Sequence, residues 1–95
     1  MNASSSTQTV TGALTFETVP DLYRNSSSWF EGTGDLILDL AQVGRTDSAG
    51  LALLIEWLRR AQAANRKLHF ANIPLQVQTL IRINGLQDAL LSSNS

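Results

Sequence analysis

The sequence predicts an α/β fold, because segments with strand patterns alternate along the chain with segments of helical periodicity. The apolar run DLILDL over residues 35–40 is typical of a central strand covered on both faces. A loop over 41–46, a long helix over 48–65 and a strand over 66–71 follow, which predicts one right-handed βαβ unit with parallel strands. We therefore expect a small mixed sheet in β-α-β-α-β-α order with helices packed against it.

The N-terminal third predicts a strand and then a helix. Val10, Leu14 and Phe16 share one parity with Gly12 between them, which indicates a half-buried strand with a bulge at the glycine. Pro20 suits the first turn of a helix. This helix has a loose apolar face and a run of serines that are poor helix formers: Leu22, Tyr23, Trp29 and Phe30, with serines at 26–28.

The helix over 48–65 carries the clearest apolar stripe. On a helical wheel five positions span about 120°, the width of a core-facing stripe: Leu51, Leu54, Ile55, Leu58 and Ala61. Leu53 and Trp57 lie well away from this stripe, with Arg60 between them. An exposed Trp and Leu beside an Arg is typical of binding hot spots. Burial of this second stripe under the third helix is the alternative, and both interpretations stay open.

The last third predicts a helix that begins at Pro74 and ends at Asn84 and Gly85, with five apolar positions: Leu75, Val77, Leu80, Ile81 and Ile83. Residues 86–91 are expected to pack back as a short turn or helix. The domain is placed at residues 9–91, between flexible polar tails at 1–8 and 92–95.

Composition excludes several classes of function. A net charge of −1 and seven scattered Lys and Arg residues give no electrostatic footprint for nucleic acid. The basic pairs Arg59-Arg60 and Arg66-Lys67 fall near the end of the long helix, where cations complement the helix dipole. With no cysteine and one histidine, we expect no disulfide, no metal site and no other cofactor.

The sequence predicts a soluble, cytoplasmic protein. The N-terminus has no signal-peptide pattern, and the longest apolar run is far shorter than the roughly 20 residues that span a bilayer.

The segment of residues 45–51 (RTDSAGL) carries the most chemical meaning. Asp47 and Ser48 are preferred N-cap residues, whose side-chain oxygens accept from the free N–H groups of the first helical turn. Gly50 lets another backbone or a ligand approach closely, and the helix N-terminus favours an anion or a carboxylate. A cap and a packing glycine would explain the same residues without any partner, so spacing alone leaves both interpretations open.

Other polar residues give weaker signals. Asp39, at the end of the apolar strand, is expected to accept hydrogen bonds from loop amides; support of the Asp47 loop or cation binding are the alternatives. His69 has the opposite parity to its apolar neighbours, which predicts a surface or helix-covered side chain and not a base. Although Ser48, His69 and Asp47 are triad residue types, two are adjacent and the chain has no G-x-S-x-G elbow, so we expect no catalytic residue. The single G-x-G at 32–34 lacks the Lys and the spacing of a nucleotide loop.

A first strand, the DLILDL strand and the string TDSAGLALL at 46–54 together resemble the STAS family over residues 9–91. This family includes anti-sigma-factor antagonists, cytoplasmic tails of anion transporters and small subunits of lipid-transporting ABC systems. The string is most similar to the MlaB-type subunits of phospholipid-transport systems. The resemblance implies a non-catalytic STAS domain that binds the cytoplasmic ATPase subunit at the inner membrane, with no nucleic acid and no small-molecule substrate of its own.

The resemblance implies a partner-binding surface around the D-S-A-G turn, extended by the second stripe of the helix: Arg45, Thr46, Asp47, Ser48, Ala49, Gly50, Leu53 and Trp57. In phosphorylated antagonists of the family the acceptor hydroxyl directly precedes the glycine, and Ala49 stands there in this chain. Ser48 is the remaining candidate, so the resemblance argues against a phosphoswitch. It favours an accessory subunit of an ABC-type phospholipid transporter that maintains outer-membrane lipid asymmetry. The alternatives are a phosphorylation-controlled anti-sigma-factor antagonist and, on the helix N-terminus alone, a small nucleotide- or anion-binding domain.

Overall fold

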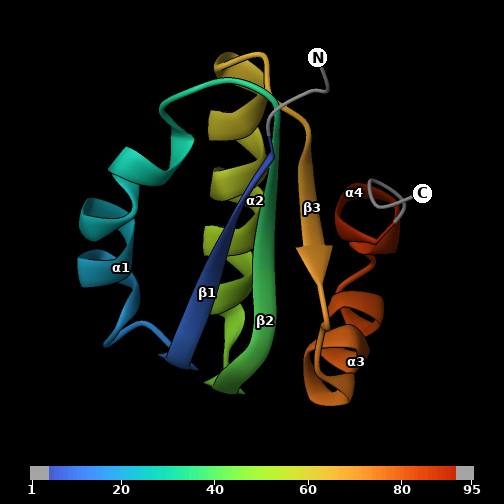
Figure 1. Cartoon of the computed structure of the whole chain (residues 1–95). Helices are drawn as coiled ribbons and strands as arrows, with labels where there is room; N and C mark the ends of the chain where they lie inside the picture. The colour runs from blue at the N-terminus through green and yellow to red at the C-terminus, as the bar shows by residue number, and fades with distance from the viewer. Residues whose placement is uncertain (1–4, 92–95) are drawn as a thin grey trace.

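Three strands form a sheet in the order β1-β2-β3 in the computed structural model, which describes residues 5–91 (Figure 1). The strands are β1 (Ser5–Leu14), β2 (Asp35–Thr46) and β3 (Leu68–Ala71). The helices are α1 (Val19–Asn25), the 3₁₀ helix η1 (Ser27–Phe30), α2 (Ser48–Ala63), α3 (Leu75–Ile83) and α4 (Gln87–Leu90). This confirms the α/β class and the alternating order. Both described strand pairs are parallel, whereas we expected a mixed sheet.

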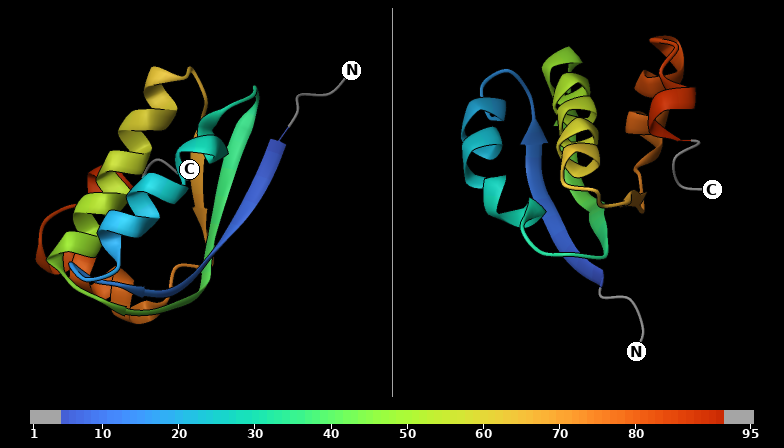
Figure 2. Two further views of the ribbon diagram at one scale, coloured as in Figure 1. Left: turned by 90° about the vertical axis from the view of Figure 1, so that its left-hand side faces the viewer. Right: turned by 90° about the horizontal axis from the view of Figure 1, so that it is seen from above.

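The helices lie together on one face of the sheet (Figure 2). On β2 the leucines at 36, 38 and 40 are buried against them, whereas Asp35, Ile37 and Asp39 on the opposite face are only half-buried. The expectation that DLILDL is covered on both faces is therefore wrong. Its two aspartates already make it an alternating strand, the pattern of a sheet with one solvated face.

The paired strands extend beyond the residues whose apolar pattern predicts a strand. β2 continues through the segment that we expected to be a loop, because it pairs with β1 as far as Thr46. The register shifts at Thr9/Thr11 and again between Gly12 and Leu14, and Gly12 has a φ of +86°, so the predicted bulge is confirmed. Residues 5–8 belong to β1 and not to a tail; residues 1–4 and 92–95 lie outside the described part of the chain.

The buried face of α2 is turned relative to the wheel prediction. Leu51, Leu54 and Ala61 are buried as expected, but so are Leu53 and Trp57, whereas Ile55 and Leu58 are only partly buried. Helices α1 and η1 cause this difference, because they cover the second stripe. The Trp57 Nε1–H donates to the buried Ser26 Oγ at 2.9 Å, and the rings of Trp57 and Trp29 lie 5.5 Å apart.

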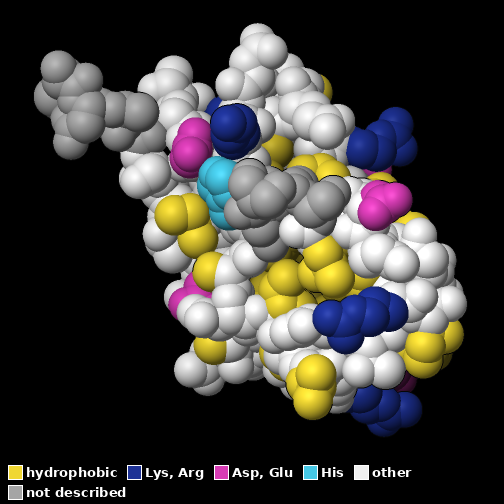
Figure 3. All heavy atoms as spheres, turned by 90° about the vertical axis from the view of Figure 1, so that its right-hand side faces the viewer, with side chains coloured by type: hydrophobic (Ala, Val, Ile, Leu, Met, Phe, Trp, Pro, Cys, Tyr) yellow, Lys and Arg dark blue, Asp and Glu magenta, His cyan; other side chains and the backbone are white. Residues whose placement is uncertain are grey.

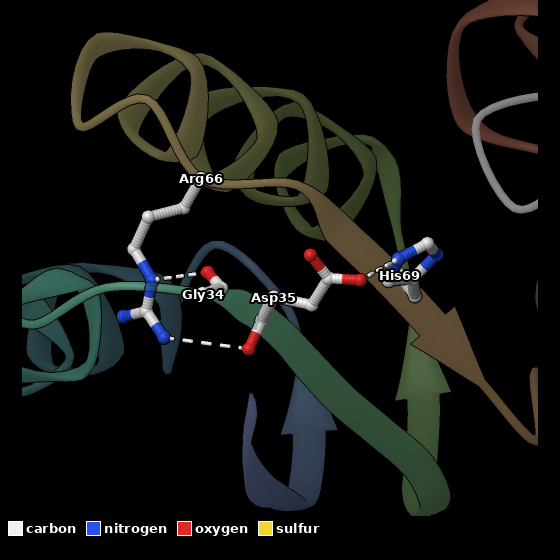
Figure 4. A network of polar contacts seen from close by, with 4 residues as sticks. All are labelled: Gly34, Asp35, Arg66 and His69. Atoms are coloured by element: carbon white, nitrogen blue, oxygen red, sulfur yellow. Dashed lines mark hydrogen bonds and ion pairs between the residues drawn. The ribbon is translucent and has the colours of Figure 1, made fainter. Parts of the chain in front are cut away.

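Arg66 ties the start of β2 to the end of α2 (Figure 4). Its side chain is buried, and its guanidinium donates to the Ser6 hydroxyl and to five backbone carbonyls, those of Trp29, Glu31, Thr33, Gly34 and Asp35. The glycines at 32 and 34, both with positive φ, bend the chain around it. Arg66 is therefore a structural clasp between these segments, whereas we expected it to complement the helix dipole.

The remaining C-terminal elements agree with the sequence. Helix α3 follows Pro74 and ends at Asn84 and Gly85, and α4 packs back with Leu90 buried. On α3, Val77 and Ile81 face the core, whereas the predicted apolar positions 75 and 83 are exposed. None of the helices within residues 5–91 is long and apolar enough to cross a lipid bilayer.

Candidate functional site

The candidate site lies at the end of the sheet where β1 and β2 end and α2 begins (lower edge of Figure 1). Asp47 caps α2: its Oδ1 accepts from the backbone N–H groups of Ala49 at 2.9 Å and Gly50 at 3.2 Å. Its Oδ2 accepts from the N–H of Phe16 at 3.2 Å, and its own N–H donates to the Leu14 carbonyl at 3.0 Å. One side chain thus holds the β1–α1 loop, the end of β2 and the start of α2 together.

The pKa of Asp47 lies below its ordinary value. Desolvation pushes it upward, but the N–H donors of Phe16, Gly50 and Ala49 and the positive charge of Arg45 together outweigh that effect. The carboxylate is therefore charged at neutral pH and engaged on both oxygens. This arrangement is a helix cap.

Gly50 is a packing residue of the protein's own core. A Cβ built there would lie 2.3 Å from the Leu14 carbonyl oxygen, 2.8 Å from the Leu14 Cβ and 2.9 Å from the Thr46 Cγ2. The missing side chain therefore lets α2 approach β1, as the packing alternative supposed. The expectation that Gly50 opens space for a partner is wrong, because β1 already fills that space.

The exposed part of the turn consists of Arg45, Ser48 and Phe16. Phe16 follows β1 with its side chain 72% exposed, although parity placed it on the buried face of the strand. Its N–H bond to Asp47 holds it beside the turn. We call Phe16, Arg45 and Ser48 the docking corner. Its position could have indicated this exposure, because Phe16 comes after the last buried residue of β1 and lies next to the loop that precedes the helix.

Thr46 and Ala49 are half-buried at the border of this corner, and the Thr46 hydroxyl donates to the Gly44 carbonyl at 3.1 Å. Leu53 and Trp57 are 2% and 0% exposed, so they cannot extend the corner as a surface stripe. Their predicted role in partner contact is corrected to one in the core.

A shallow groove continues from the corner between α1 and α2, which lie side by side over the sheet (Figure 2). Its volume is about 390 Å³, and it is lined by Val19, Tyr23, Ala49, Ala52, Leu53 and Glu56. Four of the six lining residues are aliphatic, and the other two are Tyr23 and Glu56. The groove and the docking corner share the first turns of α2.

The other candidate polar residues lie away from the corner. Asp39 Oδ1 accepts from the Ala41 N–H at 2.9 Å and from the Asn72 amide at 3.1 Å, and these bonds, the Ala41 one foremost, lower its pKa. His69 is partly buried, and its Nε2 lies 3.1 Å from Oδ2 of Asp35 at the start of β2 (Figure 4). Ser48 follows the other end of β2, so these groups do not form a triad.

Two further exposed apolar side chains lie on α3. Leu75 and Ile83 are 72% and 74% exposed. Figure 3 looks onto this side of the molecule, where hydrophobic side chains gather near the middle of the face with separate Lys and Arg side chains around them. The Gln76 side chain donates to the Gly44 carbonyl at 2.9 Å, which fixes the start of α3 beside the end of β2.

Comparison with known proteins places this geometry in a family. A family model described as the MlaB-type STAS domain matches residues 1–92. Among solved structures, a sulfate transporter family protein from Wolinella succinogenes is similar with a TM-score of 0.74 and 17% identity, over 90% of this chain and 70% of that one. The unphosphorylated anti-sigma factor antagonist SpoIIAA is similar with a TM-score of 0.62 and 15% identity, over 86% of this chain and 76% of that one. No curated protein sequence matches.

Proposed function

Because the chain belongs to the MlaB-type STAS domain family, we propose that it is a non-catalytic accessory subunit of an ABC-type phospholipid transporter. In this role it binds the cytoplasmic ATPase subunit through the docking corner and regulates that ATPase, peripheral to the inner membrane and in support of outer-membrane lipid asymmetry. STAS domains as a class serve regulation and interaction, which agrees with such a role.

The observation that carries the proposal is the position of Ser48. It is the first residue of α2, its small side chain is exposed, and it lies between the capping Asp47 and the half-buried Ala49. A partner can approach closely there. Phe16 adds an exposed aromatic ring and Arg45 a guanidinium beside the same turn, and aromatic residues and arginine are enriched among binding hot spots.

The site favours docking over chemistry for a physical reason. Both oxygens of Asp47 accept backbone N–H groups and its pKa is lowered, so it is a poor proton acceptor. His69 lies with Asp35 at the start of β2, away from the corner. A turn whose polar groups are satisfied internally presents a defined shape, which suits recognition by a second protein.

Ser48→Arg tests the proposal. A long charged side chain at this position would prevent close approach, so we expect affinity for the cognate ATPase subunit to fall at least about 30-fold, the loss of one interface hot spot. The measurement is co-purification of the two proteins, followed by biolayer interferometry. Ser48→Ala, which adds no bulk, should bind within about threefold of the wild type.

Ala63→Arg is the matched control, because it places the same side chain at an exposed position at the other end of α2. A cation is unfavourable at a helix N-terminus by about 0.3–1 kcal/mol and favourable at the C-terminus, so both variants should remain folded by circular dichroism. Wild-type affinity of folded Ser48→Arg would remove the docking corner from the interface and contradict the proposed mode of binding.

A phosphorylation-controlled anti-sigma-factor antagonist is the second candidate, supported by the exposed Ser48 hydroxyl. Ala49, directly before the glycine, cannot accept a phosphate. Likeness to SpoIIAA at 15% identity extends to the fold alone. A stoichiometric phosphate on Ser48, measured by mass spectrometry after incubation with a cognate kinase and ATP, would favour this candidate; an unchanged mass supports the transporter subunit.

A further inference from the structure

The groove between α1 and α2 combines an apolar lining with one carboxylate. Val19, Ala49 and Ala52 supply the accessible apolar walls, and Glu56 lies one turn along α2 from Ala52. Since Ala49 belongs both to the groove and to the border of the docking corner, a partner seated on Ser48 covers the groove as well.

The charge of Glu56 is only weakly compensated. Its ion-pair partner is Arg59, with a distance of 3.5 Å between Nη1 and Oε1 and a side chain that is 74% exposed. Such exposed pairs are worth little. Arg60, four residues after Glu56 on α2, lies against one wall of the groove: its guanidinium is 4.0 Å from the centroid of the Tyr23 ring, and it donates to the Tyr23 carbonyl at 3.4 Å.

The apolar walls and the Glu56 carboxylate together favour one kind of partner side chain in the groove. A wholly apolar side chain would fill the walls, but the partner around it would remove water from the Glu56 carboxylate without replacing its hydrogen bonds, which is costly. An acidic side chain would meet repulsion from the same carboxylate. Arginine has an apolar stem to lie along the walls and a planar head that donates two parallel hydrogen bonds to a carboxylate.

We propose that the groove lined by Val19, Ala52 and Glu56 receives an arginine side chain of the ATPase subunit, with its guanidinium on the Glu56 carboxylate. This proposal rests on the proposed function, because it takes the ATPase as the occupant. It adds to the docking corner a charged contact that orients the partner, since one anionic side chain in an apolar groove accepts a cation in a defined direction.

Three variants test the contact, each measured against the purified ATPase subunit by biolayer interferometry at low and high salt. Glu56→Gln keeps the shape and removes the charge, so the Kd should rise about tenfold or more, and the salt dependence of binding should flatten. Ala52→Phe, at an exposed position, fills the groove and should raise the Kd by a similar factor. Arg59→Gln is the matched control: it breaks the same ion pair but frees Glu56, so the Kd should be unchanged or lower.

The outcomes separate this proposal from the proposed function. If Ser48→Arg abolishes binding while Glu56→Gln binds at wild-type affinity, the groove contact is wrong and the docking corner stands. If Glu56→Gln weakens binding with an unchanged salt slope, or if Arg59→Gln weakens it equally, an arginine on Glu56 is also refuted. If the wild-type chain does not bind the ATPase, the proposed function fails first. Thermal unfolding of each variant confirms that it is folded.

Discussion

Gly50→Ala separates packing from partner contact at the D-S-A-G turn. A methyl group at this position would lie 2.3 Å from the Leu14 carbonyl oxygen and 2.8 Å from the Leu14 Cβ, whereas ordinary contacts lie at 3.4–4 Å. The first of these neighbours is backbone, so α2 must move away from β1 by about 1 Å. Inserting a methyl group into a tightly packed site costs about 1–3 kcal/mol.

Helix propensity opposes that cost. Alanine is better than glycine in a helix interior by up to about 1 kcal/mol, so the net loss of unfolding free energy should be about 1–2 kcal/mol. For a domain of this size that corresponds to a fall in Tm of about 5–15 °C. Ala52→Gly, at an exposed position two residues further along α2, measures the propensity effect in reverse.

Thermal and urea unfolding followed by circular dichroism measure both variants, and binding to the ATPase is measured well below the lowered Tm. We expect the folded fraction of Gly50→Ala to bind with an affinity close to that of the wild type. A variant that is more stable than the wild type would refute the packing argument, because it would mean that the methyl group meets open space. Full stability with lost binding would return Gly50 to the interface.

The other predictions concern the core, the clasp and the cap. In urea titrations, Leu53→Ala should lower the unfolding free energy by about 2–5 kcal/mol and Leu58→Ala by about 1–2 kcal/mol, because only the Leu53 side chain is fully buried. A larger loss for Leu58→Ala than for Leu53→Ala would mean that α1 does not cover α2. Arg66→Met keeps the apolar stem but leaves backbone carbonyls without their donor, and should cost about 3 kcal/mol in the same assay; a loss under about 1 kcal/mol would show that water replaces the guanidinium. The pKa of Asp47 is lower in the folded state, so its stabilising effect is present above the ordinary aspartate pKa of 3.8 and is lost as the pH falls through the folded pKa. Asp47→Asn should therefore have a flatter dependence of Tm on pH below about pH 4, and parallel curves would contradict the lowered pKa.

The alternation of strands and helices could be predicted because it depends on local patterns. The helix on 48–63, the bulge at Gly12 and the cap at Asp47 follow from periodicity and from preferences of single residues. The extent of β2 could not be predicted in this way. Residues 41–46 have no strand pattern of their own, and they are extended because β1 supplies their partners.

The second stripe of α2 shows the same limit in the candidate site. A helical wheel shows which side chains share a face of one helix, but it does not show which other helix covers each face. Trp57 is buried because Ser26, at the break between α1 and η1, accepts its indole N–H. The serine run that weakens the helical pattern thus provides the buried acceptor. Phe16 was assigned to the wrong surface because its strand ends two residues earlier, at Leu14.

The inward-facing and the outward-facing residues of the turn have different effects on binding. Asp47 and Gly50 face inward and fix the positions of three separate chain segments, whereas Phe16, Arg45 and Ser48 face outward from those segments. Because the inward contacts are already made in the free chain, a partner gains the outward contacts with little loss of backbone freedom. Substitutions of the inward residues should therefore lower binding mainly by lowering the folded fraction of the protein. In the proposed mode of binding, the outward residues and the adjoining groove determine which protein is recognised, since they present their side chains to it.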